Sequence, residues 1–213
     1  MTTHILKILI SSLLGTCLFS IGATSEPIPK RKKTELVIIS TKFGEITIFL
    51  FDETPLHKAN FLKLVKSGFY DSIRFHRVIK DFIIQAGDPY TKPGADSTRI
   101  GIGGPGYTLP AEIIPHFRHE RGTVAAARQM DAINPKRESS GSQFYIVQSE
   151  KGAPHLDGSY TIFGKVIRGI EIVDKIASVQ VLSSGMPVEP IYITLKTKKI
   201  SLKRLKSEYD VNL

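Results

Sequence analysis

The stretch Phe75-His76-Arg77-Val78-Ile79-Lys80-Asp81-Phe82-Ile83-Ile84-Gln85-Ala86-Gly87-Asp88 places an arginine and a glutamine in a segment that otherwise has the composition of a buried strand. Its aromatic and β-branched residues are typical of a sheet core. Arg77 and Gln85 lose solvation on such a surface unless a ligand uses them. An arginine is a permanently charged set of donors, and next to phenylalanine side chains it predicts a groove for a ligand that carries carbonyl groups.

Short β-rich segments occur on both sides of this stretch. Residues 36–40 and 45–51 are separated by a short turn that contains Gly44, and apolar and polar side chains alternate in the second of them, which predicts a β-hairpin. Residues 90–110 are dense in glycine and proline and predict a long surface loop. Further strands are expected at residues 123–127, 143–147, 160–166 and 191–195.

Two segments have a helical pattern. The first begins after Thr54, a favourable N-cap residue, with Pro55 at the first helical position. Its buried face is expected to include Leu56 and Val65. The second helix is expected at residues 170–177. Many short strands with two helices argue against an alternating βαβ sheet and favour a closed antiparallel barrel with helices at its ends.

The chain of 213 residues is long enough for one sizeable domain. A polar start, an apolar run and small residues predict a secretory signal peptide over residues 1–25, so we expect an exported, periplasmic protein. Lipid attachment at Cys17 or an uncleaved signal anchor are the alternatives. The rest of the chain is predicted as a linker rich in proline and lysine at 26–34, a domain at 35–200 and a basic tail at 201–213.

The formal net charge of +9 is concentrated at the two ends of the chain. We interpret these clusters as solvated tails, so no nucleic-acid partner is expected; the basic tails are the feature that would favour one. Cys17 is the only cysteine, and signal cleavage removes it. The mature chain would then have neither disulfides nor cysteine chemistry.

Other candidate motifs are interpreted as structural. Residues 101–106 match a dinucleotide-binding fingerprint only formally, because Pro105 interrupts it and no helical pattern follows. His116 and His119 are expected to be surface histidines, so no metal site is predicted. His76 is expected to pack rather than to transfer protons, and the spacing of the carboxylates selects no hydrolytic pair.

Three further motifs follow the opening stretch in order: Gly141-Ser142-Gln143-Phe144-Tyr145-Ile146, Leu156-Asp157-Gly158 and Phe163-Gly164-Lys165-Val166. Together the four motifs resemble the cyclophilin family of peptidyl-prolyl cis-trans isomerases, and the resemblance covers residues 36–195. It implies a mainly β fold, a closed eight-stranded antiparallel barrel capped by two α-helices, with the active groove on the outer face of the barrel.

The resemblance also implies roles for individual residues. It assigns Arg77 as the catalytic residue. His155 stands where the best-known members carry tryptophan at the rim of the groove, so weak inhibition by cyclosporin is expected. Tyr160 stands where many members have histidine, and its hydroxyl can still form a hydrogen bond there. The implied substrate-binding residues are Phe82, Ile83, Gln85, Ala127, Arg128, Gln143, Tyr145, His155, Leu156 and Tyr160.

Rotation of an X-Pro bond requires no nucleophile, metal or cofactor, because its barrier of about 18 to 20 kcal/mol comes from amide resonance. An apolar pocket can hold the proline ring while Arg77 donates to the twisted amide. The expected partners are proline-containing polypeptides, among them unfolded exported proteins, and a monomer is expected because a closed barrel has no free edge strand. The alternative is a peptide-binding or chaperone module of the same fold with little or no turnover.

Overall fold

The predicted hairpin is present in the computed structural model, which describes residues 33–209. β1 (Lys33–Thr41) and β2 (Gly44–Leu50) pair antiparallel, with Thr41 opposite Gly44. Gly44 has a φ of +131°, and a Cβ at this position would lie 2.8 Å from Ile172 Cδ1. The turn therefore requires glycine both for its backbone conformation and for the close approach of the helix that contains Ile172.

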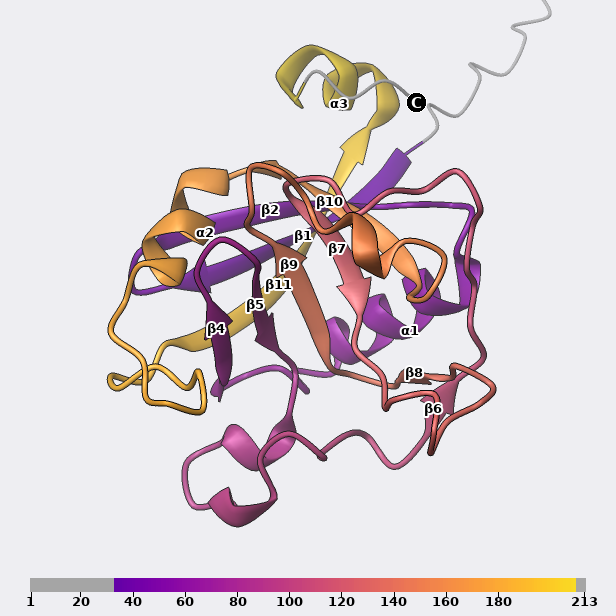
Figure 1. Cartoon of the computed structure of the whole chain (residues 1–213). Helices are drawn as coiled ribbons and strands as arrows, with labels where there is room; N and C mark the ends of the chain where they lie inside the picture. Colours follow the sequence, from indigo (N-terminus) through magenta and orange to yellow (C-terminus); the bar gives the residue numbers. More distant parts are fainter. Residues whose placement is uncertain (1–32, 210–213) are drawn as a thin grey trace, which may run out of the picture. The chain divides into compact units, whose positions relative to one another are not determined.

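The two strands belong to a nine-stranded sheet whose paired strands are all antiparallel, and which curls around the hydrophobic core (Figure 1). The strand order is β3-β11-β1-β2-β10-β7-β9-β5-β4. A separate two-stranded sheet, β6-β8, lies at the outside. The remaining strands are β3 (Ile73–Arg74), β4 (Arg77–Ile79), β5 (Ile83–Ala86), β6 (Thr108–Leu109), β7 (Thr123–Ala126), β8 (Ser139–Ser140), β9 (Phe144–Val147), β10 (Ile162–Arg168) and β11 (Tyr192–Ser201).

The two edge strands of this sheet, β3 and β4, are neighbours in the chain and are separated only by Phe75 and His76. The Phe75 amide donates to the Ile191 carbonyl at 3.1 Å, on the β11 side, and the His76 amide donates to the Gln85 carbonyl at 3.1 Å, on the β5 side. The mainly β, antiparallel fold is confirmed. The strand count differs from the expected eight because the segment 73–79 bends at Phe75-His76 and forms both edges of the sheet.

Two helices pack against the core at opposite sides of the curled sheet (Figure 1): α1 (Pro55–Lys66) and α2 (Ile170–Ala177). Both were predicted. The expected buried face of α1 is confirmed at Val65 but wrong at Leu56, which is 50% exposed. The face that packs on the core consists of His57, Phe61, Leu64 and Val65.

Contacts at the start of α1 explain why its buried face differs from the expected one. Thr54 lies at the N-cap, but its hydroxyl makes no capping hydrogen bond. Glu112, from a distant loop, takes that role: its carboxylate accepts the Leu56 amide at 3.0 Å and the His57 amide at 2.9 Å. The same carboxylate lies 2.6 Å from His57 Nδ1, so the buried histidine is held against the helix end.

The segment after residue 200, predicted as a basic tail, contains a third helix, α3 (Leu202–Tyr209). Leu205 is fully buried in a small cluster with Leu36, Phe49 and Ile200, so this helix is docked on the sheet. β1 begins at Lys33, within the range predicted as linker. The predicted signal peptide, with Cys17, lies outside the described residues. Among residues 33–209, no helix has both the length and the hydropathy that a membrane span requires.

Candidate active site

The hairpin β4–β5 places Arg77 and Gln85 opposite each other, both partly exposed, while Val78 and Ile84 point into the core. The guanidinium of Arg77 lies 6.0 Å from the Phe82 ring centroid, and its Nη1 donates to Gln85 Oε1 over a long 3.5 Å. The outer edge of β4 is covered, because the Val78 amide donates to the Gly185 carbonyl at 2.7 Å. Arg77 thus lies on a strand that is bonded on both sides, and its guanidinium has further N–H donors available for a ligand.

The register of the neighbouring strands builds the opposite wall. Gln85 pairs with Tyr145, which in turn pairs with Ala125, so residues of β5, β9 and β7 share the outer face of the sheet. There, a second hydrophobic cluster of six buried residues, including Ile83 and Tyr145, is separate from the core inside the curled sheet. Phe82, Ala127, Leu156 and Tyr160 pack against it. An apolar surface on the outside of a curled sheet indicates a binding site.

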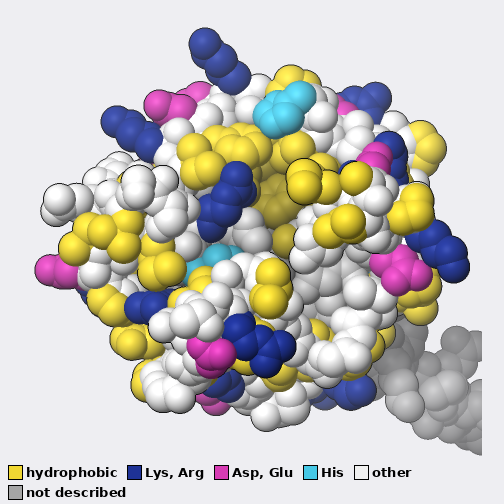
Figure 2. All heavy atoms as spheres, turned by 60° about the horizontal axis from the view of Figure 1, so that its bottom comes forward, with side chains coloured by type: hydrophobic (Ala, Val, Ile, Leu, Met, Phe, Trp, Pro, Cys, Tyr) yellow, Lys and Arg dark blue, Asp and Glu magenta, His cyan; other side chains and the backbone are white. Residues whose placement is uncertain are grey.

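This surface is hollowed into a pocket of about 270 Å³. In Figure 2, apolar side chains gather around a hollow with a basic side chain beside it. The pocket brings together nine of the residues that the sequence analysis selected: Arg77, Phe82, Ile83, Gln85, Ala127, Arg128, Tyr145, Leu156 and Tyr160. We call it the prolyl pocket, after the ligand that the sequence predicts.

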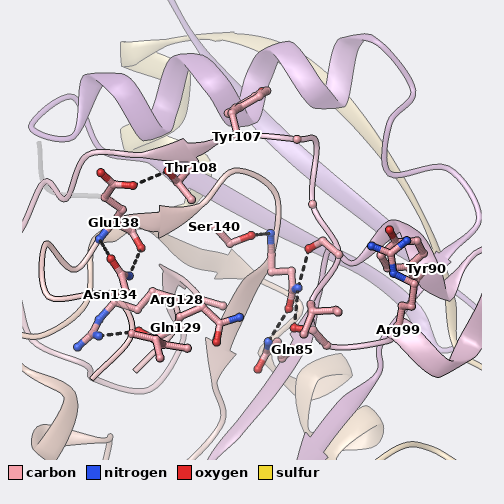
Figure 3. Close-up of a pocket in the computed structure, with 18 residues that line it drawn as sticks. Gln85, Tyr90, Arg99, Tyr107, Thr108, Arg128, Gln129, Asn134, Glu138 and Ser140 are labelled. Carbon is pink, nitrogen blue, oxygen red and sulfur yellow. Dashed lines mark hydrogen bonds between the residues drawn. The ribbon is translucent and has the colours of Figure 1, made fainter. Parts of the chain in front are cut away.

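His155 and Gln143, the other two selected residues, lie outside this pocket. His155 is exposed and stacks on Phe82, with ring centroids 5.3 Å apart, so it stands at the rim as expected. Gln143 is buried at an adjoining pocket of about 760 Å³ that shares Gln85, Ala127 and Arg128 with the first. Gln85 Nε2 donates to Gln143 Oε1 at 3.0 Å, which links the two pockets (Figure 3).

Arg128 is engaged within the chain rather than free to bind a peptide through its guanidinium. Its Nε donates to the Ser159 carbonyl at 2.7 Å, its Nη1 lies 2.5 Å from Asp131 Oδ1, and its guanidinium is 4.5 Å from the Tyr160 ring centroid. Only 5% of the side chain is exposed. Arg128 therefore holds Tyr160 in the wall of the prolyl pocket.

The glycine-rich residues 101–106 bind a carboxylate of the protein itself, that of Asp88. The fully buried Asp88 carboxylate accepts the amides of Tyr90 at 2.8 Å, Gly101 at 2.6 Å and Gly103 at 3.1 Å. A Cβ on Gly103 would lie 2.0 Å from Asp88 Oδ1, which explains the glycine there. Gln143 Nε2 donates to the carbonyls of Gly101 and Gly103, so Asp88 also fixes the wall of the adjoining pocket.

The expectation that His116 and His119 are both surface histidines is wrong for His119. His116 is exposed, but His119 is only 2% exposed and lies between Asp157 and the hydroxyl of Tyr145. Within residues 33–209, no three His, Cys, Asp or Glu side chains gather as a metal site would require. The sequence gives no sign of this role for His119, because its partners are 26 and 38 residues away in the chain.

His76 is buried next to Arg77, and its Nδ1 has no hydrogen-bond partner within the described residues. Burial, together with the positive charges of Arg77 and Arg74, lowers the pKa of His76 to about 4, against the smaller opposing effect of Asp88. The imidazole is therefore neutral in the folded protein at neutral pH, which favours the packing role.

This pKa predicts a loss of stability in acid. The unfolded chain binds a proton at His76 below pH 6.5, whereas the folded chain does so only near pH 4, so stability is complete above pH 6.5 and falls as the pH is lowered. Between pH 7 and 4 the loss through His76 is about 3 kcal/mol. Urea unfolding of His76→Gln should show a shallower pH dependence by this amount, with the exposed His116→Gln as control. Equal slopes in His76→Gln and the parent protein would contradict the assignment.

The fold and the pocket together define an antiparallel β-protein with a pocket on the outside of its curled sheet, in which an arginine lies beside apolar side chains. Residues 36–197 match the family described as cyclophilin type peptidyl-prolyl cis-trans isomerase/CLD. The chain belongs to this family.

Individual relatives agree with this assignment. The chain is 36% identical over 168 residues to peptidyl-prolyl cis-trans isomerase CYP18-2 of Arabidopsis thaliana, covering 77% of this chain and 93% of that protein. It is 37% identical over 169 residues to peptidyl-prolyl cis-trans isomerase-like 2 of Rhizopus delemar, covering 77% of this chain but only 29% of that longer protein. The crystal structure of a cyclophilin type peptidyl-prolyl cis-trans isomerase of Cryptosporidium parvum superposes with a TM-score of 0.67 at 34% identity, covering 78% of this chain and 98% of that one.

Proposed function

We propose that the groove accelerates cis-trans rotation of X-Pro bonds in exported polypeptides. The observation that carries the proposal is the position of Arg77, whose guanidinium borders a pocket lined by Phe82, Ile83 and Leu156. These three side chains form an apolar wall for a proline ring, and the charged donor of Arg77 stands beside it. This is the arrangement that rotation of an amide requires, because no atom has to be transferred.

The chemistry follows from the amide. In the twisted state the nitrogen loses conjugation, becomes pyramidal and can accept a hydrogen bond, whereas the planar ground state offers no such lone pair. A donor placed there stabilises the twisted state more than either planar isomer and so lowers the barrier. Arg77 is suited to this because its guanidinium remains protonated. Gln85 and Gln143, fixed by their mutual hydrogen bond, would hold the peptide backbone.

Exchange NMR on a short X-Pro peptide tests the activity. The protein should increase the cis-trans exchange rate at catalytic concentration, and an unchanged rate would overturn the proposal. If the peptide binds without faster exchange, the chaperone module of the same fold becomes the better description. Binding and exchange are both visible in one titration, so the two functions separate.

The exported location has its own test. Residues 1–25 have the composition of a signal peptide, so the secreted or periplasmic fraction should contain a chain that begins near residue 26. N-terminal sequencing of the mature protein checks this. A chain that retains residue 1 would indicate an uncleaved signal anchor instead. A chain that carries a lipid on Cys17 would indicate a lipid anchor instead.

A further inference from the structure

Behind the prolyl pocket, three side chains from separate parts of the sequence form a hydrogen-bonded series. Asp157 Oδ1 accepts both the backbone amide of His119, at 2.8 Å, and its ring Nδ1–H, also at 2.8 Å. With the proton on Nδ1, Nε2 carries the lone pair, and it lies 3.0 Å from the hydroxyl of Tyr145. The carboxylate therefore fixes the tautomer of His119, and the hydroxyl of Tyr145 donates to Nε2.

The rings are packed as closely as the hydrogen bonds suggest. The imidazole of His119 is inclined by only 13° to the Tyr145 ring, and Tyr160 meets both rings edge-on, at 86° and 84°. Tyr145 and Tyr160 line the prolyl pocket, whereas His119 does not. His119 is thus behind the wall and can affect a ligand only through the rings in front of it.

The backbone of His119 also bonds to the segment that contributes Leu156 to the pocket wall. Its carbonyl accepts the amide of Ala153 at 2.7 Å, at the start of the short 3₁₀ helix η3 (Pro154–Leu156). Leu156, a further residue of the pocket wall, is followed directly by Asp157. His119 is therefore bonded to both ends of the segment that contributes Leu156, as well as to Tyr145.

We infer that His119 is a positioning residue of the prolyl pocket, which holds the Tyr145 ring through the series Asp157–His119–Tyr145. It binds the hydroxyl of Tyr145 on the side away from the ligand, so that the pocket presents the apolar face of the ring. The inference rests on the proposed function in taking proline as the ligand of the pocket.

Without His119, the buried hydroxyl of Tyr145 has no acceptor on that side and turns toward water or toward the ligand. The ring then packs less firmly, and the pocket gains a polar group where a proline ring should fit. Within the described residues, the hydrogen bond of the Arg77 guanidinium goes to Gln85 and not to this series. Loss of His119 should therefore weaken proline binding more than it slows rotation of a bound peptide.

The charge state of His119 matters for the same reason. The groups that face the His119 ring are Tyr145, Tyr160, Asp157 and, further away, His155. The second carboxylate oxygen of Asp157 lies 3.8 Å from Arg118 Nε. Burial lowers the pKa of His119 below its ordinary value, against the opposing effect of Asp157. Protonation in acid converts Nε2 from acceptor to donor, and the Tyr145 hydroxyl then loses its acceptor. Peptide binding should weaken as the pH falls below 6.5.

Three variants test the inference: His119→Gln, Tyr145→Phe and the double variant. The Kd of an X-Pro peptide from NMR titration should rise about threefold to tenfold in each single variant, while the exchange rate of the bound peptide stays within about twofold. Because both substitutions break the same hydrogen bond, the double variant should be little weaker than either single variant. The matched control is His116→Gln, which changes an exposed histidine three residues away.

The pH profile provides a second readout that a merely structural role would not change. The parent protein should lose affinity in acid, at a pH below the ordinary pKa of histidine, and both Tyr145→Phe and His119→Gln should lack this acid dependence. Independent, additive effects in the double variant, or an acid dependence that survives in both single variants, would overturn the inference. If His119→Gln does not fold, Tyr145→Phe and the parent profile still decide it. Because Kd does not depend on the exchange rate, a failure of the proposed catalysis would be seen separately in the exchange rate.

Discussion

Replacing Arg77 with alanine should lower kcat/KM for an X-Pro peptide by about 100- to 1,000-fold, while the protein remains folded. The guanidinium is held by a long 3.5 Å hydrogen bond to Gln85 and lies beside the ring of Phe82 at the border of the prolyl pocket. A partly exposed strand residue of this kind contributes little to the core. Its removal therefore affects the reaction and not the fold.

The loss should appear in the rotation step rather than in binding. The apolar pocket, formed by Phe82, Ile83, Tyr145, Leu156 and Tyr160, remains in place and continues to bind the proline ring. What disappears is the donor for the pyramidal nitrogen, an interaction that exists only near the transition state. NMR titration should give a Kd for the peptide within a few-fold of the parent, with the exchange rate of the bound peptide near that of the free peptide.

Two companion variants sharpen this experiment. Arg77→Lys keeps a positive charge but has neither the planar fork nor its reach, so it should recover only part of the rate. Arg168→Ala removes an exposed arginine whose guanidinium stacks on Tyr209, the last residue of α3, and it should leave the rate unchanged. An Arg77→Ala protein with nearly the parent's rate would remove Arg77 from the mechanism.

Replacing Asp88 with alanine should lower the free energy of unfolding by about 3 kcal/mol or more. Its carboxylate is fully buried and accepts three backbone amides from Tyr90, Gly101 and Gly103. Removing it leaves these donors without a partner in a buried site, and each such donor costs about 1 to 3 kcal/mol. The loop formed by residues 89–103 then loses its three hydrogen bonds to the Asp88 carboxylate.

The same variant should also weaken peptide binding, because Gln143 is positioned by the carbonyls of Gly101 and Gly103. Urea unfolding and NMR titration measure the two effects. Asp96→Ala is the matched control: Asp96 also caps a short 3₁₀ turn, through the amide of Thr98, but it is exposed and should change stability by less than about 0.5 kcal/mol. Similar losses in the free energy of unfolding for Asp88→Ala and Asp96→Ala would show that the buried carboxylate of Asp88 stabilises the fold no more than an exposed cap does.

Local patterns in the sequence were sufficient to predict the strands and much of the groove. The hairpin β1–β2 follows from alternation and a glycine turn, and the wall with Arg77, Phe82 and Gln85 lies in a single stretch of chain. The helix α3 was missed although Leu202, Leu205 and Tyr209 have helical spacing, because the surrounding lysines suggested a solvated tail.

The contacts that could not be predicted are those between distant residues. Glu112 bonds to the start of α1 across 55 and 56 positions, Asp88 bonds to glycines 13 and 15 positions away, and His119 meets Asp157 across 38 positions. Each is a buried or largely buried polar group whose partner is selected by the folded structure and not by neighbouring residues. Such groups are visible in a sequence only as polar residues without an evident purpose.

The bend at Phe75-His76 has a consequence for the order in which the protein folds. The segment that carries Arg77 also forms β3, in which Ile73 and Arg74 pair with Ile193 and Tyr192 of β11. Closing this edge of the sheet brings together residues that are separated by more than half of the 213-residue sequence. Contacts of this range form late and slowly. We therefore expect the strand that precedes Arg77 to be among the last parts of the groove to become fixed during folding.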